Sequence, residues 1–83
     1  MLSWEHLREV ADKGPEKAIR DFAFDHLGLQ RLELRAGINN FPSRRVAEKL
    51  GFLLEGELRQ DAAGSNGRYS CALYGMLASD PRP

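Results

Sequence analysis

Polar and apolar residues alternate along two segments of the chain, and a third segment is apolar on both faces. Residues 31–36 alternate, which is typical of a half-buried strand, with the inward face formed by Leu32, Leu34 and Ala36. Residues 52–59 alternate in the same way and predict a second strand, with the inward face formed by Phe52, Leu54, Gly56 and Leu58. Residues 68–77 are apolar on both faces, which favours the central strand of a sheet.

Apolar residues recur at helical spacing in residues 4–11, 15–27 and 43–50, so we predict a helix in each. In the second helix Arg20 is expected on the outer side, paired with Glu16 one turn earlier. The core-facing stripe of that helix is predicted to consist of Ile19, Phe22, Ala23, His26 and Leu27.

The helix over residues 43–50 has a predicted start and a predicted end. Ser43 is a suitable N-cap because its hydroxyl can accept a hydrogen bond from the first turn, and Pro42 disfavours helix at Phe41. Gly51 can adopt the left-handed conformation after the last turn, with Phe52 folding back on the helix.

Two segments are predicted to be irregular. Residues 61–67 are rich in turn formers and end in Asn66-Gly67, a strong hairpin signal. Residues 79–83 are predicted to be a frayed tail. The pieces predict an α/β fold of the α+β type in a single domain, residues 1–83, with about three strands and two to three helices. Its parts are a helical segment (1–13), the main body (14–78) and the tail (79–83).

Composition excludes several classes of function. Twelve acidic and twelve basic residues balance, which argues against a protein that binds nucleic acid by neutralising phosphates. The single cysteine, Cys71, rules out an intrachain disulfide and a multi-cysteine zinc site, and we predict no metal. No apolar run approaches the ~20 residues that span a bilayer, and residues 1–5 lack the features of a signal peptide. We therefore expect a cytoplasmic protein with no membrane partner.

One segment resembles a known family. Asn40-Phe41-Pro42-Ser43-Arg44-Arg45-Val46-Ala47-Glu48-Lys49-Leu50-Gly51-Phe52 is similar to the last conserved segment of the GNAT N-acetyltransferases. Asp21-Phe22-Ala23-Phe24, residues 31–35 and Gly67-Arg68-Tyr69 resemble the same family, in the branch that acetylates ribosomal-protein N-termini. The resemblance runs from about residue 18 to residue 77 and covers only the C-terminal half of such an enzyme. It implies a partial GNAT (acyl-CoA N-acyltransferase) fold.

The resemblance also implies a cofactor and site residues. Acetyl-CoA would be the acyl donor, with Asn40 on its pantetheine arm and Ser43 protonating the departing thiolate as the catalytic residue. Ser43 would lie near the coenzyme sulfur, and Arg44, Arg45 and Lys49 would contact the coenzyme phosphates. The residues themselves leave simpler readings open: Asn40 as a turn residue, Ser43 as a helix cap, and Arg44, Arg45 and Lys49 as a solvated helix face.

Two functions follow from these observations. The first is an acetyl-CoA-dependent N-acetyltransferase acting on an amine, possibly a protein N-terminus, either as a truncated member of the family or completed by a second polypeptide. The second is a non-catalytic dimerisation or binding module, because residues 4–13 contain no glycine-rich pyrophosphate loop. Either function predicts a homodimer or a partner chain that completes the sheet at the unpaired edge of residues 31–36.

Overall fold

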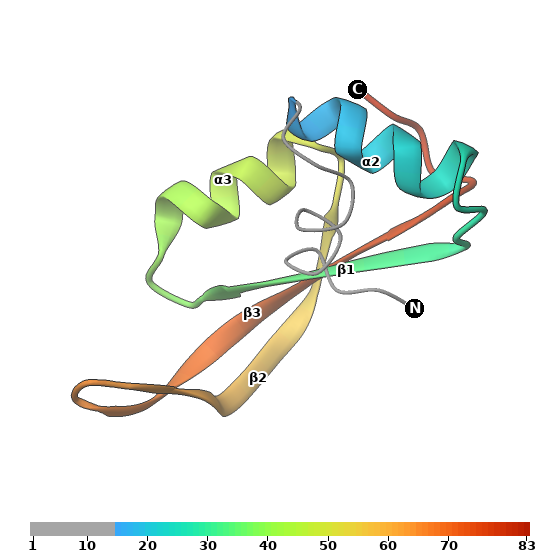
Figure 1. The fold of residues 1–83 in the computed structure, drawn as a ribbon. Helices are drawn as coiled ribbons and strands as arrows, with labels where there is room; N and C mark the ends of the chain where they lie inside the picture. The colour runs from blue at the N-terminus through green and yellow to red at the C-terminus, as the bar shows by residue number, and fades with distance from the viewer. Residues whose placement is uncertain (1–14) are drawn as a thin grey trace.

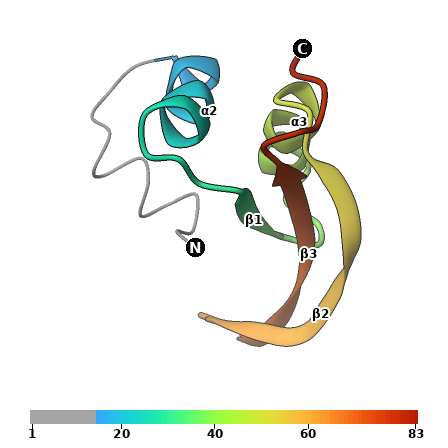
Figure 2. The ribbon, with the colours of Figure 1, turned by 90° about the vertical axis from the view of Figure 1, so that its right-hand side faces the viewer.

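The computed structural model describes residues 15–83, which form two helices and three strands in the order α2 (Glu16–Asp25), β1 (Arg31–Gly37), α3 (Phe41–Lys49), β2 (Leu53–Gly64) and β3 (Gly67–Leu77). Both helices lie on one side of the sheet, and the β2–β3 hairpin extends beyond them (Figure 1). The sheet is strongly curved when viewed along its edge (Figure 2). The predicted α+β fold with three strands is confirmed, whereas the helix predicted over residues 4–11 lies outside the described residues.

The last strand is the central one, as predicted. The strand order is β1-β3-β2, and β3 pairs antiparallel with both neighbours, so β1 and β2 run parallel to each other on either side of it. Three cross-strand pairs of β1 and β3 form the centre of the core: Leu32 with Met76, Leu34 with Tyr74, and Ala36 with Ala72. All six residues are buried. The alternation predicted for residues 31–36 is therefore confirmed.

The predicted inward face of β2 is wrong for Leu54, which is 56% exposed, and Leu58 is only half-buried. The neighbouring Leu53 is 63% exposed, and β2 runs on to Gly64. Register shifts between Leu54 and Gly56 and between Leu58 and Ala62 interrupt the alternation, so no single face of β2 stays inward. The hairpin turn is also shorter than predicted and consists of residues 65 and 66 alone.

Helix α2 buries a different face from the predicted one. Ile19 and Ala23 are buried as expected, but His26 and Leu27 are exposed beyond the helix end, and Phe22 is only half-buried. Their places are taken by Phe24 and by Arg20, which is only 3% exposed. The outward position predicted for Arg20 is therefore wrong.

Arg20 is buried because its guanidinium satisfies backbone carbonyls. Its Nη1 donates to the carbonyl oxygen of Leu50 at 2.8 Å and to that of Pro83 at 3.3 Å. Leu50 is the C-cap of α3, where carbonyl groups lack partners within the helix. Arg20 thus joins α2, the end of α3 and the C-terminal segment.

The C-terminal segment is held against α2, so the prediction of a frayed tail is wrong. Arg82 donates to Asp25 at 3.0 Å and to Asp21 at 3.3 Å, and its guanidinium lies 4.9 Å from the centre of the Phe24 ring. The ion pairs and the cation–π contact hold this terminal segment in place.

Candidate functional site

The N-terminus of α3 is capped by Asn40, which corrects the prediction that Ser43 is the cap. The side-chain Oδ1 of Asn40 accepts a hydrogen bond from the backbone N–H of Ser43 at 3.4 Å. The helix begins at Phe41, and Pro42 is tolerated because an N–H group in the first turn has no partner within the helix. Ser43 is partly exposed, and its hydroxyl makes no hydrogen bond within residues 15–83.

The C-terminus of α3 has the predicted glycine cap. Gly51 has a φ of +95°, its N–H donates to the carbonyl of Glu48, and the N–H of Phe52 donates to that of Ala47. These two hydrogen bonds form a Schellman motif, and Phe52 is buried beside the helix as expected.

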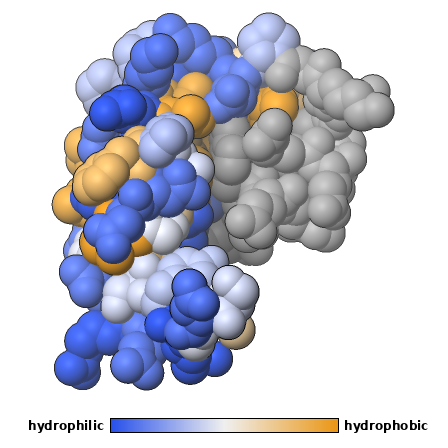
Figure 3. Space-filling view, turned by 90° about the vertical axis from the view of Figure 1, so that its left-hand side faces the viewer, coloured by the Kyte–Doolittle hydropathy of each residue, from blue (hydrophilic) through white to orange (hydrophobic). Residues whose placement is uncertain are grey.

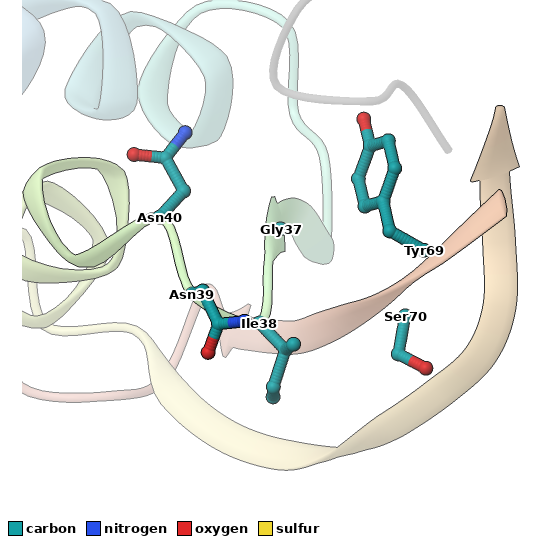
Figure 4. A pocket seen from close by; sticks show the side chains of 6 residues that line it. All are labelled: Gly37, Ile38, Asn39, Asn40, Tyr69 and Ser70. Carbon is teal, nitrogen blue, oxygen red and sulfur yellow. The ribbon is translucent and has the colours of Figure 1, made fainter. Parts of the chain in front are cut away.

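A pocket of about 380 Å³ lies where β1 ends, beside the turn into α3 and the start of β3. Figure 4 shows the residues that line it: Gly37, Ile38, Asn39, Asn40, Tyr69 and Ser70. None of these side chains is charged, so the pocket suits a neutral ligand that forms hydrogen bonds. The pocket includes Asn40 from the predicted site, but Ser43, Arg44 and Lys49 do not line it.

Two glycines position the aromatic wall of the pocket. A Cβ on Gly37 would lie 3.4 Å from one edge of the Tyr69 ring, and a Cβ on Gly64 would lie 3.2 Å from the other edge. In Figure 4 the ring of Tyr69 and the amide of Asn40 rise on the same side of the pocket. Tyr69 was not predicted as a site residue. The available signal was its place two residues after the Asn66-Gly67 dipeptide.

Arg44 is engaged within the protein. Its Nη1 donates to the carbonyl oxygen of Ile38 at 2.8 Å, and its Nε donates to the hydroxyl of Tyr74 at 3.1 Å. The guanidinium also lies 5.9 Å from the centre of the Phe41 ring. A coenzyme contact by Arg44 stays a prediction, and it would have to use the remaining nitrogen, Nη2, or displace these partners.

Arg45 and Lys49 lie on the exposed face of α3, one turn apart, and form no ion pair within the part of the chain that the structure describes. Figure 3 shows the side of the molecule that lies to the left in Figure 1, where the surface at the tip of the β2–β3 hairpin is mostly hydrophilic and the hydrophobic surface lies nearer the helices. The two basic side chains are therefore available to an anionic ligand, and the role predicted for Lys49 stays a prediction.

The shifted pKa values belong to ion pairs away from the pocket. Hydrogen bonds from Arg31 lower the pKa of Glu55, and those from Arg82 lower the pKa of Asp25. Within residues 15–83 no cluster of His, Cys, Asp and Glu side chains is arranged to hold a metal ion, and neither helix is long and apolar enough to span a membrane.

Part of the chain is similar to a known protein family. Residues 16–53 match the model of the acetyltransferase (GNAT) domain, and this segment contains Asn40 and Ser43. The match confirms the predicted resemblance at the level of the GNAT domain. The branch that acetylates ribosomal-protein N-termini stays a prediction. No curated protein matches the chain.

Three solved structures of acetyltransferases are similar to this chain. A GCN5-related N-acetyltransferase from Brucella melitensis is 37% identical, with a TM-score of 0.67 over 72% of this chain and 27% of that one. A GNAT-family acetyltransferase from Bacillus anthracis is 26% identical, with a TM-score of 0.71 over 77% of this chain and 39% of that one. A mutant spermidine N-acetyltransferase from Vibrio cholerae is 22% identical, with a TM-score of 0.71 over 76% of this chain and 37% of that one, and shows a likeness of fold alone.

The chain thus spans between 27% and 39% of the length of these three structures. Its three antiparallel strands and two helices form part of the GNAT fold.

Proposed function

We propose that this chain forms the coenzyme-binding wall of an acetyl-CoA-dependent N-acetyltransferase, which transfers acetyl to an amine. One observation carries the proposal: the uncharged pocket at the start of α3 includes Asn40, within the segment that matches the GNAT domain. The pocket offers amide and backbone groups to a ligand that is itself rich in amides, such as the pantetheine arm.

Asn40 has one polar atom left for such a ligand. Its Oδ1 caps α3, and its Nδ2 remains able to donate to a carbonyl oxygen. The same amide therefore stabilises the helix and can position the coenzyme. This dual use makes the cap and the binding site one structure.

Ser43 is the proposed proton donor. In acyl transfer the amine attacks the thioester carbonyl carbon, the carbon–sulfur bond breaks, and the thiolate takes up a proton, while the proton that the nitrogen releases restores the proton donor. The Ser43 hydroxyl is partly exposed and is not used as a helix cap, which leaves it free to deliver that proton directly or through a water molecule.

A second copy or another polypeptide would supply the remaining wall of the site. Among the described strands, β1 and β2 each pair on one side only, so both offer an unpaired edge. The exposed Leu53 and Leu54 on β2 favour such a contact, and they also support the alternative function of a non-catalytic dimerisation module. A cytoplasmic location remains part of this proposal.

The test is calorimetric titration of the purified chain with acetyl-CoA, with the oligomeric state measured in the same buffer. Asn40→Ser keeps a capping oxygen but loses the amide, whereas Asn40→Ala loses both. We expect saturable binding that both variants weaken to a similar extent, while only Asn40→Ala lowers stability. A folded chain that shows no binding at millimolar acetyl-CoA would refute coenzyme binding and leave the dimerisation module.

A further inference from the structure

Arg44 connects the turn that carries Asn40 to the central strand. The turn runs from Gly37 to Asn40, and the backbone of Ile38 within it is held from two sides. Its N–H donates to the carbonyl of Ser70 on β3 at 2.9 Å, and its carbonyl accepts from Nη1 of Arg44 at 2.8 Å. Ile38 lies two residues before Asn40, so its orientation limits where the amide of Asn40 can lie.

A partly buried hydrogen-bond network fixes Arg44 in turn. Nε of Arg44 donates to the Tyr74 hydroxyl at 3.1 Å, and that hydroxyl donates to a carboxylate oxygen of Glu48 at 3.0 Å. Tyr74 is fully buried on β3, and Glu48 lies one turn after Arg44 on α3. The guanidinium is therefore held in one orientation by neighbours on its own helix and on the sheet.

We propose that Arg44 is a positioning residue, which holds the Gly37–Asn40 turn so that Asn40 faces the ligand, and that it does not contact the coenzyme phosphates. The inference rests on the proposed function for the identity of the ligand. The positioning contact itself rests only on the hydrogen bonds of Ile38 and Tyr74.

A phosphate contact and a positioning contact differ in their ligand dependence. S-acetyl-pantetheine carries the amides and the thioester of acetyl-CoA but no phosphate. If Arg44 contacts phosphate, its loss should weaken the binding of acetyl-CoA alone. If Arg44 positions Asn40, its loss should weaken the binding of both ligands equally, because both need Asn40.

The variant to test is Arg44→Met, which keeps the aliphatic stem and removes every donor. Arg45→Met is the matched comparison: Arg45 is the exposed neighbour on the same helix, so any binding that this variant loses should be lost for acetyl-CoA alone. We expect Arg44→Met to weaken binding of acetyl-CoA and S-acetyl-pantetheine by the same factor, about tenfold. The double variant Arg44→Met/Asn40→Ser should bind no more weakly than Asn40→Ser alone. A loss confined to acetyl-CoA, or factors that multiply in the double variant, would overturn the inference.

A ligand-free measurement separates this inference from the proposed function. In nitrogen-15 NMR spectra, Arg44→Met should shift or broaden the amide signals of Ile38, Asn39 and Asn40, and Arg45→Met should leave them unchanged. Unchanged signals in Arg44→Met would refute the positioning contact whatever the chain binds. If Arg44→Met does not fold, Tyr74→Phe removes only the hydroxyl that holds Nε of Arg44 and should still shift the same amide signals, and unchanged signals would then refute the positioning contact. If the wild type binds neither ligand, the proposed function fails, and the NMR result still decides the role of Arg44.

Discussion

Arg31 on β1 and Glu55 on β2 form an ion pair across the central strand β3, over Gly75. Nη1 of Arg31 lies 3.1 Å from Oε2 of Glu55, and a second hydrogen bond joins Nη2 to Oε1. A Cβ on Gly75 would lie 2.5 Å from Oε2 of Glu55, so the pair needs a residue without a side chain beneath it. The contact links two strands that are not neighbours.

Gly75→Ala should displace the Glu55 carboxylate and cost at most about 1 kcal/mol, because the displaced group ends a flexible side chain and the ion pair is partly exposed. In a Glu55→Ala background the same substitution should cost nothing. A double-mutant cycle by urea unfolding measures the difference. An equal cost in both backgrounds would show that Gly75 is needed for another reason.

Stability should fall in acid as the carboxylates of two ion pairs are protonated. Hydrogen bonds from Arg31 and from Arg82 hold the pKa values of Glu55 and Asp25 below their ordinary range. Because the folded-state pKa is lowered, each contribution is present above the ordinary pKa and is lost as pH falls through the folded-state value. For the Glu55 pair we expect less than about 1 kcal/mol, because solvent screens it. Between about pH 7 and about pH 2, the free energy of unfolding should fall less steeply in Glu55→Gln than in the wild type.

Arg20→Met should lower the free energy of unfolding by about 1–3 kcal/mol, because it leaves the Leu50 and Pro83 carbonyls without their donor. Arg45→Met is the exposed control on α3 and should change stability by less than about 0.5 kcal/mol. Chemical denaturation measures both. Equal effects would mean that the buried guanidinium adds nothing.

Gly51→Ala should destabilise the protein by about 1–2 kcal/mol, since φ is +95° there and a Cβ would lie 2.8 Å from Cδ of Pro83. Gly56→Ala is the matched control because a Cβ there meets nothing within 4 Å. Thermal unfolding of the two variants should separate clearly. A tolerant Gly51 would indicate that the end of α3 relaxes.

Asn40→Ala should cost about 1 kcal/mol through the lost cap, whereas Ser43→Ala should change stability by less than about 0.5 kcal/mol. Ser43→Ala therefore tests chemistry without disturbing the fold: under the proposed function it should slow acetyl transfer while coenzyme binding persists. A large loss of stability in Ser43→Ala would restore the capping role.

Local patterns predicted local structure. The alternation around Leu34, the apolar composition around Tyr74 and the glycine at position 51 led to correct elements, because each depends on neighbours in the chain. The failures involve partners far away in sequence. Arg20 looked like a surface residue because its acceptors lie at Leu50 and Pro83.

The same limit applied to the site. Asn40 could be identified through the family segment, but the opposite wall depends on the Tyr69 ring lying between Gly37 and Gly64. Those three residues come from three strands, and only the folded sheet brings them together. Choosing between Asn40 and Ser43 as the cap failed for a smaller reason: both are good capping residues, three positions apart.

The central place of β3 dictates an order of assembly. Strand β1 pairs only with β3 within this sheet, and Arg31 lies opposite Leu77 at the far end of the last strand. During synthesis β1 and β2 would both leave the ribosome before the strand that joins them. Strand β1 then remains unpaired until β3 has been synthesised. The three-stranded sheet therefore forms late, through long-range pairing, which is slow and exposes the chain to aggregation.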